Sequence, residues 1–263
     1  MPDAPDQPML LRAAEGGVVN LTLNRPQAFN SLSEALIEAI QRELDRIEAD
    51  DDARVLVLRG NGKAFSAGHD LKEMGENRTR EDLARLFQRC SAMMTRLAKL
   101  PVPVVAVVDG IATAAGCQLV AACDLAVASD RARFATSGVK YGLFCSTPMV
   151  ALSRNVPRKP ALEMLLTGDF IDAATAERHG LVNEVAPAAQ LEDAVGRLTA
   201  RLVDKPKDVL ALGKRAFYAQ LEMGLEEAYA FTTEAIVDNA LMADFDEGLT
   251  AFKEKRQPRW NAS

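Results

Sequence analysis

The chain has 263 residues, of which 48% are hydrophobic and 26% charged, a composition typical of a soluble globular protein with one large or two modest domains. Its formal net charge is −6 and no basic stripe offsets the acidic excess, which argues against nucleic acid as a partner. No apolar run approaches the roughly 20 residues of a membrane-spanning helix, so we expect no contact with a membrane.

Cysteine and histidine usage indicates neither disulfides nor a metal site. The four cysteines form no CxxC pair, and the two histidines lie far apart in the sequence. We therefore expect no bound metal, and reduced thiols in a cytoplasmic protein. The first ten residues, MPDAPDQPML, resemble neither a secretory signal nor a transit peptide, which also favours a cytoplasmic location. The residues concerned are Cys90, Cys117, Cys123, Cys145, His69 and His179.

The first part of the chain is predicted to alternate strands and helices. Residues 10–23 contain short alternating apolar runs broken by glycines, a pattern that favours a hairpin. A helix is expected over 31–49, because apolar residues recur at helical spacing after the capping residue Ser33. A buried strand is expected over 54–59.

The middle of the chain repeats this alternation, with very small residues at the turns. A segment over 60–74, a loop with a helical start at residues 70–72, leads into a helix over 79–100 and a buried strand over 104–108. Small residues at 112–116 then precede a helix start and a further strand over 124–128. This order predicts an α/β fold with a mainly parallel sheet and right-handed crossovers.

The last part of the chain changes character near residue 190, where strands cease. We therefore divide the chain into a core of residues 1–190 and a helical subdomain of residues 191–263. The sequence predicts helices over 149–155, 159–167 and 172–179, a strand over 181–185, and then helices over 191–203, 208–220, 225–242 and 244–256.

Two small-residue turns, Ser66–His69 and Ala114–Cys117, each follow a predicted strand. Ligands of open parallel sheets bind at the carboxyl ends of the strands, where two such turns would lie side by side. Two backbone N–H groups aimed at one point form an oxyanion hole, which stabilises negative charge on a carbonyl oxygen. The alternative is that both turns only let helices pack closely against the sheet, and the spacing alone leaves both open.

Five segments together resemble the crotonase (enoyl-CoA hydratase/isomerase) superfamily over nearly the whole chain. The resemblance implies a fold of repeated ββα units with two roughly perpendicular sheets, a helical C-terminal trimerisation subdomain, and a homotrimer or a dimer of trimers. The matching segments are NRPQAFNSL (24–32), GKAFSAGHDLKEM (62–74), PVPVVAVVDGIATAAGCQLVAACDLAVAS (101–129), LTGDFIDAATAERHGLVNEV (166–185) and EGLTAFKEKRQPRW (247–260).

The resemblance also implies roles for individual residues. Family members bind acyl-CoA thioesters, and the oxyanion-hole donors here would be the backbone N–H groups of His69 and Ala115. Coenzyme A is part of the substrate, so no separate cofactor is expected. The lysines have an alternative role as solvated surface charges. The residues matching the family's coenzyme A site are Arg25, Lys63, Ala67, His69, Asp70, Leu71, Lys72 and, from a neighbouring subunit, Phe252 and Lys255.

Two departures from the family pattern bear on catalysis. The hydratases of this family carry two glutamates, and the matching positions here hold Gln118 and Gly138. An amide cannot exchange a proton as a carboxylate does, and glycine has no side chain. General acid–base catalysis therefore lacks both usual groups, and ordinary hydration of a 2-enoyl-CoA becomes doubtful.

Three other residues are candidates for chemistry at this site. Cys145 precedes a predicted helix, whose N-terminus would lower its pKa and make it a nucleophile; a buried structural cysteine is the alternative. Ser146 occupies the position at which some dehalogenating relatives place a nucleophilic Asp. The His69 side chain could be an acid or a base, but we expect it to face outward while its N–H acts. Gln118 could still orient a water or a polar acyl group.

The sequence therefore predicts an acyl-CoA-binding enzyme of fatty acid metabolism, similar to enoyl-CoA hydratases and isomerases, that stabilises a thioester enolate. A lyase or isomerase activity is the expected type. The alternative is a non-catalytic acyl-CoA-binding or regulatory protein. A serine peptidase, which the related fold also serves, lacks a suitable histidine because His179 lies at a predicted helix end.

Overall fold

The computed structural model describes residues 7–76 and 78–260. In this part of the chain six strands form one sheet, parallel throughout except for the antiparallel hairpin β1–β2. Residues 10–23 thus form the predicted hairpin. The strand order is β1 (Leu10–Glu15), β2 (Val18–Leu23), β3 (Val55–Gly60), β5 (Val104–Val108), β7 (Leu125–Ser129) and β10 (Glu184–Ala186).

A second sheet is built from four very short strands. Each of β3, β5 and β7 in the first sheet is followed at once by a strand of the second, so the chain alternates between sheets before entering its next helix. This alternation confirms the predicted fold of repeated ββα units with two sheets. The strands of the second sheet are β4 (Ala64–Ser66), β6 (Ile111–Thr113), β8 (Arg133–Ala135) and β9 (Ile171–Asp172).

The central strands β3, β5 and β7 of the larger sheet are buried on both faces, which explains their continuous apolar runs. On one face Val55, Val105 and Val127 pack against helix α8 (Leu191–Val203). The opposite face belongs to the main core cluster, in which three helices supply most of the buried helical residues. These helices are α1 (Glu34–Glu48), α3 (Arg80–Lys99) and α4 (Ala115–Ala122).

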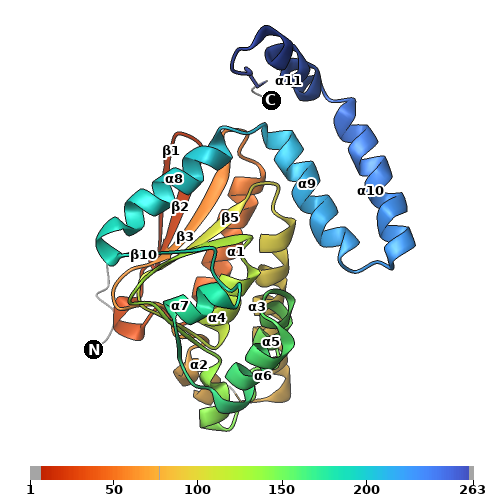
Figure 1. Cartoon of the computed structure of the whole chain (residues 1–263). Coiled ribbons are helices and arrows are strands. Elements are labelled where there is room, and N and C mark those ends of the chain that lie inside the picture. Colours follow the sequence, from red (N-terminus) through yellow and green to blue (C-terminus); the bar gives the residue numbers. More distant parts are fainter. Residues whose placement is uncertain (1–6, 77, 261–263) are drawn as a thin grey trace.

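The remaining helices lie at the edges of this body (Figure 1). Around the second sheet are α2 (Leu71–Glu76), α5 (Pro148–Asn155), α6 (Arg158–Thr167) and α7 (Ala173–Arg178), with the 3₁₀ turn η2 (Ser137–Tyr141). The C-terminal helices are α9 (Lys207–Gln220), α10 (Leu225–Ala240) and α11 (Ala243–Glu254).

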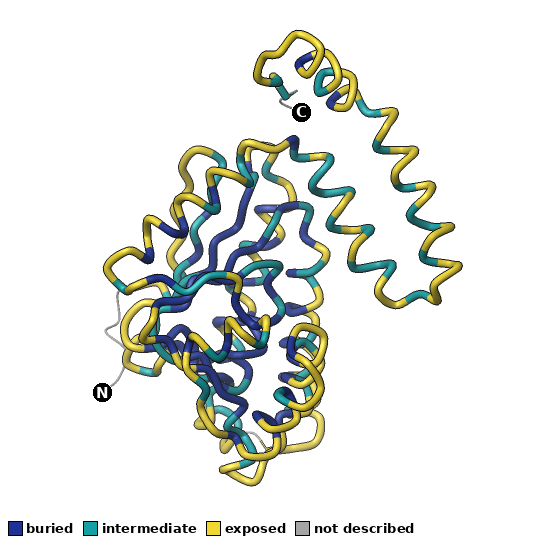
Figure 2. The backbone as a smooth tube through the Cα atoms, in the orientation of Figure 1, coloured by how far each residue is buried: buried dark blue, intermediate teal, exposed yellow. Residues whose placement is uncertain are grey.

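Helices α10 and α11 extend away from the body of the molecule (Figure 1). Figure 2 shows that they are largely exposed, whereas the central strands β3, β5 and β7 are dark with buried residues. The helix-only character of the chain after residue 190 agrees with the sequence pattern. Helix α8 nevertheless packs on the sheet, so the arm that leaves the body is shorter than the predicted subdomain of residues 191–263.

Two sequence predictions of local structure were wrong. The loop expected after residue 60 contains strand β4, and the last strand begins at Glu184 rather than at residue 181, whereas the helical start expected at residues 70–72 is confirmed by α2. In both places the strand has only three residues, too few for a hydrophobic alternation to set its bounds.

Candidate functional site

The two small-residue turns meet at the ends of β4 and β6, which pair in parallel. Gly68 has φ +92°, and a Cβ built on it would lie 3.1 Å from the Ala115 nitrogen. A Cβ on Gly116 would overlap the Ser66 carbonyl. Only glycine allows these close approaches, and as a result the backbone N–H groups of His69 and Ala115 are held near one another.

Ala114 holds the second turn in an unusual backbone conformation, with φ 50° and ψ −121°. Glycine is the residue that usually adopts this φ/ψ region, and any other residue there raises the conformational energy by on the order of 1–3 kcal/mol. The conformation sets the direction of the next peptide, whose N–H belongs to Ala115, the first residue of α4. Neither this N–H nor that of His69 has a hydrogen-bond partner within residues 7–76 and 78–260.

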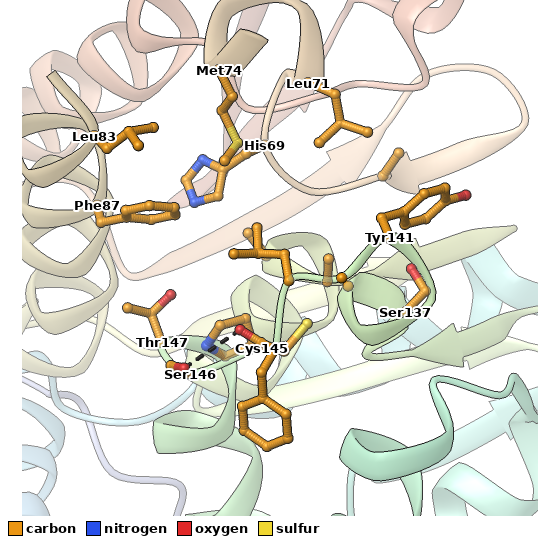
Figure 3. A pocket seen from close by; sticks show the side chains of 18 of the residues that line it. His69, Leu71, Met74, Leu83, Phe87, Ser137, Tyr141, Cys145, Ser146 and Thr147 are labelled. Atoms are coloured by element: carbon orange, nitrogen blue, oxygen red, sulfur yellow. Dashed lines mark hydrogen bonds between the residues drawn. The ribbon is translucent and has the colours of Figure 1, made fainter. Parts of the chain in front are cut away.

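A cavity of about 530 Å³ opens beside these two turns. One wall comes from α2 and α3 and is apolar, with Met74, Leu83 and Phe87 (Figure 3). The other comes from η2 and the loop after it, and includes Leu143 and Phe144. None of the described residues that line the cavity carries a carboxylate.

The side chain of His69 lies in this cavity, so the expectation that it faces outward was wrong. Its ring meets that of Phe87 edge-on, with centroids 5.2 Å apart. Burial lowers the pKa of His69 to about 4, and the Leu32 carbonyl opposes this shift only partly. The imidazole is therefore neutral at physiological pH. The burial arises because the adjacent helix α3 covers the end of the first turn (Figure 3).

The positions of the two missing glutamates differ in the structure. Gln118 is 4% exposed, is absent from the cavity lining, and has an Oε1 atom without a hydrogen-bond partner among the described residues. Gly138 does line the cavity. A Cβ on Gly138 would overlap the Leu143 carbonyl and lie 2.9 Å from Cys145 Sγ, so the loop leaves no space for a side chain there.

The two candidate nucleophiles behave unlike activated groups. Burial raises the pKa of the Cys145 thiol, with partial opposition from the Gly138 N–H, contrary to the lowered pKa expected from its sequence position. Helix α5 begins at Pro148, and Cys145 meets its first turn through its backbone carbonyl, which accepts from the Met149 N–H at 3.0 Å. The Ser146 hydroxyl donates to the Phe144 carbonyl at 3.4 Å and has no basic partner among the described residues (Figure 3).

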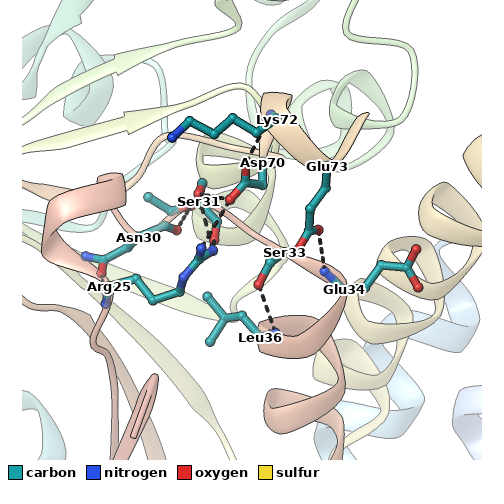
Figure 4. A network of polar contacts seen from close by, with 10 residues as sticks. Arg25, Asn30, Ser31, Ser33, Glu34, Leu36, Asp70, Lys72 and Glu73 are labelled. Carbon is teal, nitrogen blue, oxygen red and sulfur yellow. Dashed lines mark hydrogen bonds and ion pairs between the residues drawn. The ribbon is translucent and has the colours of Figure 1, made fainter. Parts of the chain in front are cut away.

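A polar network braces the turn that carries His69 (Figure 4). Arg25 donates to Asp70 at 3.2 Å and to the Ser31 carbonyl at 2.9 Å. Burial of Asp70 raises its pKa, but hydrogen bonds from the Lys72 N–H, Ser31 and Arg25 outweigh this and lower the pKa. The Arg25 guanidinium is thus already occupied by this network, and its predicted phosphate contact stays a prediction.

The other residues of the predicted coenzyme A site divide into two groups. Ala67 and Leu71 line the cavity, while Lys63 and Lys72 are exposed beside the same turn. Phe252, with 82% of its surface exposed, and Lys255 lie at the end of α11, in the arm that extends from the body (Figure 1), and neither lines the cavity of their own chain. Only a neighbouring subunit's α11 could bring these two residues to the cavity, as the resemblance predicts.

Sequence reasoning missed the wall formed by Met74, Leu83 and Phe87. Leu83 and Phe87 are four residues apart and share one side of α3, whereas Leu86, Cys90 and Met93 of the same helix are buried in the core. The available signal was that the apolar residues of α3 cover more of the helix surface than one packed face requires. That signal does not identify what the side with Leu83 and Phe87 contacts.

Comparison with known proteins gives one consistent result. The family model for enoyl-CoA hydratase/isomerase matches residues 13–263. Human enoyl-CoA hydratase domain-containing protein 3, mitochondrial, is 47% identical over 245 residues, which are 93% of this chain and 81% of that protein. The crystal structure of an enoyl-CoA hydratase from Mycobacterium smegmatis is 51% identical with a TM-score of 0.95, covering 97% of this chain and 99% of that one. The crystal structure of the human protein has a TM-score of 0.94 at 46% identity, covering 96% and 100%.

The relatives correct one prediction. The human, rat, mouse and Xenopus laevis proteins are named mitochondrial, which contradicts the cytoplasmic location expected from the N-terminal residues. The first six of those residues lie outside the described part of the chain. Across the described residues, no helix combines the length and the apolar character needed to cross a membrane.

Proposed function

The chain belongs to the enoyl-CoA hydratase/isomerase family, and on this premise we propose that it binds an acyl-CoA thioester and stabilises its enolate through the N–H groups of His69 and Ala115. One observation carries the proposal: two neighbouring turns hold unpartnered backbone donors at the mouth of an apolar cavity. Such donors are already in place, so they stabilise negative charge on the thioester oxygen without any rearrangement of the protein during the reaction.

The proposed chemistry is limited to what an oxyanion hole can do without a carboxylate. Each missing acid–base group removes a factor on the order of 10² to 10⁴ in rate. With Gln118 buried away from the cavity lining and no room for a side chain at Gly138, hydration of a 2-enoyl-CoA is expected to be very slow. Decarboxylation, and retro-aldol cleavage of a substrate that supplies its own base, need only enolate stabilisation.

Coenzyme A would follow the turn from Ala67 to Lys72. Lys63 and Lys72 are exposed beside that turn and can meet phosphates without breaking any contact among the described residues. Asp70 fixes the turn rather than binding ligand with its carboxylate, because both its oxygens already accept hydrogen bonds. Phe252 and Lys255 of a neighbouring subunit would complete the site in a homotrimer or a dimer of trimers.

The first experiment pairs binding with turnover. Binding of crotonyl-CoA is measured by calorimetry, and loss of its enoyl absorbance is followed in the same preparation. We expect binding with hydration at least 10²-fold slower than in a hydratase with both glutamates assayed alongside. Hydration at a comparable rate would overturn the roles given to Gln118 and Gly138, and absence of binding would overturn the whole proposal.

A second function, non-catalytic binding of acyl-CoA, is favoured by two features: no described cavity residue carries a carboxylate, and burial raises the pKa of the Cys145 thiol. A screen for turnover with malonyl-type and 3-hydroxyacyl-CoA thioesters separates the two functions. Product from any of these substrates would exclude the purely binding role.

A further inference from the structure

Among the described residues that line the cavity, Arg78 is the only one with a permanent charge. Its guanidinium is cationic in any protein, and it makes no hydrogen bond or ion pair with another residue of 7–76 and 78–260. No described lining residue carries a carboxylate, and burial keeps the His69 imidazole neutral. The lining therefore has a positive charge that no described residue balances.

The arginines that follow on α3 are used differently. Arg85 pairs with Asp82 at 2.6 Å, and Arg89 contacts Glu34 at 3.5 Å. Neither of these arginines lines the cavity. Acidic partners are thus present in this region, but none is placed against Arg78, whose N–H donors stay free for a ligand.

The spacing of the lining residues explains why Arg78 belongs to the cavity wall. Leu71, Met74 and Gly75 of α2 line the cavity, and positions three, four and seven residues apart share one side of a helix. Arg78 keeps this spacing just beyond the end of α2 at Glu76. It therefore extends the wall that α2 forms, at the end of the helix that is remote from the oxyanion hole.

Gly75 leaves this wall open beside Arg78. A Cβ built on Gly75 would meet nothing within 4 Å, so packing does not require a glycine there. Glycine inside a helix is unfavourable relative to alanine, because it loses more backbone freedom on folding. The missing side chain leaves space between Met74 and Arg78, through which a ligand in the cavity can approach the guanidinium.

The separation of Arg78 from the oxyanion hole sets the place of an anion on the ligand. His69 precedes α2 and Arg78 follows it, and the six residues of this helix span about 9 Å. A carboxylate on the α-carbon of the acyl group would stay beside the oxyanion hole. A carboxylate at the far end of a five-carbon acyl chain lies about 5 Å further along, and the long Arg78 side chain can cover the remaining distance.

The wall between these two ends is apolar. Met74, Leu83 and Phe87 offer methylene groups a favourable surface and offer no charge to a polar group in mid-chain (Figure 3). A guanidinium binds a carboxylate through two parallel hydrogen bonds. The lining therefore matches an acyl group with a thioester at one end, methylenes in the middle and a carboxylate at the other end.

We propose that Arg78 is a specificity-determining residue that binds a carboxylate at the far end of the acyl chain, which makes CoA thioesters of dicarboxylic acids of about five carbons the preferred ligands. This inference rests on the proposed function, because it places the thioester oxygen between the N–H groups of His69 and Ala115. The phosphates of coenzyme A are the other anions on the same ligand, and the experiment distinguishes them from the acyl carboxylate.

Binding of three ligands to the full-length protein tests the inference. Calorimetry compares glutaryl-CoA, hexanoyl-CoA and coenzyme A, and chromatography of each mixture confirms that no ligand is consumed. Hexanoyl-CoA has an acyl chain of similar length without the carboxylate, and coenzyme A has the phosphates without an acyl group. A contact with the acyl carboxylate affects glutaryl-CoA alone, whereas a contact with a phosphate affects all three ligands.

Substitutions of Arg78 give the measured effect. Arg78→Met keeps a long side chain without the charge, so it should weaken glutaryl-CoA binding about tenfold and leave the other two affinities within about twofold of wild type. Arg78→Lys keeps the charge without the paired donors and should retain part of the glutaryl-CoA affinity. Arg80→Met is the matched control: Arg80 is exposed and does not line the cavity, so all three affinities should stay as in wild type.

The outcomes separate this inference from the proposed function. Equal weakening of all three ligands by Arg78→Met would place a phosphate of coenzyme A at Arg78 and overturn the inference. No effect of Arg78→Met on any ligand would make Arg78 a solvated surface charge, which also overturns it while the acyl-CoA site stands. If neither thioester binds wild type, the proposed function fails and the inference fails with it.

Discussion

Among single residues, His69 imposes an electrostatic cost on the folded state. Its pKa is lowered from 6.5 to about 4, chiefly by burial, so the folded protein resists a proton that the unfolded chain accepts. Above pH 6.5 both states are neutral and the group does not affect stability. As the pH falls from 6.5 towards 4, the unfolded state binds more protons and folding is progressively disfavoured.

This cost predicts an acid-dependent difference between variants. From pH 7 to pH 5 wild type should lose about 2 kcal/mol more of its unfolding free energy than His69→Leu, since a leucine has no proton to exclude. Urea unfolding at the two pH values, at fixed protein concentration, measures the difference. His179→Gln is the matched control and should follow wild type; equal acid sensitivity of wild type and His69→Leu would contradict the prediction.

Gly138 yields a second prediction at this scale. Restoring the family carboxylates with Gln118→Glu and Gly138→Glu together should not restore hydration, because a Cβ at residue 138 overlaps the Leu143 carbonyl. Gly138→Ala alone should lower stability by about 1–3 kcal/mol. Crotonyl-CoA hydration and thermal unfolding measure the two effects.

The control for Gly138 is Gly196→Ala in helix α8, where an added Cβ meets nothing within 4 Å. That substitution should be neutral or stabilising, because alanine favours the helix. Rapid hydration by the Gln118→Glu, Gly138→Glu double variant would show that the loop rearranges easily, and would contradict the steric argument.

Among the elements, helix α9 is attached to the body by a buried ion pair. Lys214 contacts Asp124 at 2.6 Å and donates to the carbonyls of Leu97 and Val102. Asp124 also accepts from the Tyr218 hydroxyl at 2.8 Å and from the Val104 N–H at 2.7 Å. Burial lowers the pKa of Lys214, while Asp124 raises it in part. These contacts tie α9 to the strand and helix ends that support the site.

Lys214→Met should therefore destabilise the protein by about 3–5 kcal/mol, because it leaves the Asp124 carboxylate without its cation. Lys205→Met is the control: its partner Asp204 and Lys205 itself are both largely exposed, so the effect should stay below about 1 kcal/mol. Urea unfolding at matched concentration measures both. An equal, small effect of the two substitutions would contradict the anchoring role of Lys214.

The elements also show where sequence reasoning succeeds and fails. Helix α1 follows from Leu36, Ile37 and Ile40 at helical spacing and from Ser33, whose side chain accepts from the Leu36 N–H at 3.2 Å. The three-residue strands β4 and β6 carry no periodicity of their own, and only pairing fixes them. The family resemblance supplied the second sheet that the residue pattern could not.

Part of the candidate site could likewise be predicted from the sequence, and part could not. Its glycines and small residues mark the two turns, because close backbone approach restricts the residue types at each position. The direction of the His69 side chain depends on how α3 packs over the turn, and the raised pKa of Cys145 depends on its burial in the folded chain. Both the direction of the His69 side chain and the pKa of Cys145 depend on tertiary packing, which the local sequence pattern does not predict.

For the whole molecule, the extended C-terminal helices define an unpaired apolar surface. Proteins of this family commonly form oligomers, and in this chain large apolar side chains are exposed along α9, α10 and α11 in the absence of a partner. They are Phe217, Leu221, Leu225, Tyr229, Ile236, Val237, Leu241, Phe245, Leu249 and Phe252.

This surface predicts assembly. Sedimentation equilibrium should give three or six times the 28.5 kDa of one chain. Ile236→Glu with Leu241→Glu should lower the mass and weaken acyl-CoA binding together, because Phe252 and Lys255 reach a site only across subunits. Leu11→Glu, at an exposed position of the edge strand β1, is the control and should retain the assembly. A monomer in wild type that still binds acyl-CoA would contradict the prediction.

The Leu143 carbonyl beside Gly138 also limits which single substitutions this site accepts. Any codon change that adds a side chain at residue 138 first meets that carbonyl and Cys145, before a carboxylate could offer any catalytic benefit. The loop must therefore be rebuilt before an acid fits at residue 138, and the first substitution alone brings only a cost in stability. An acid at this position is accessible to design by replacing the whole loop rather than one residue.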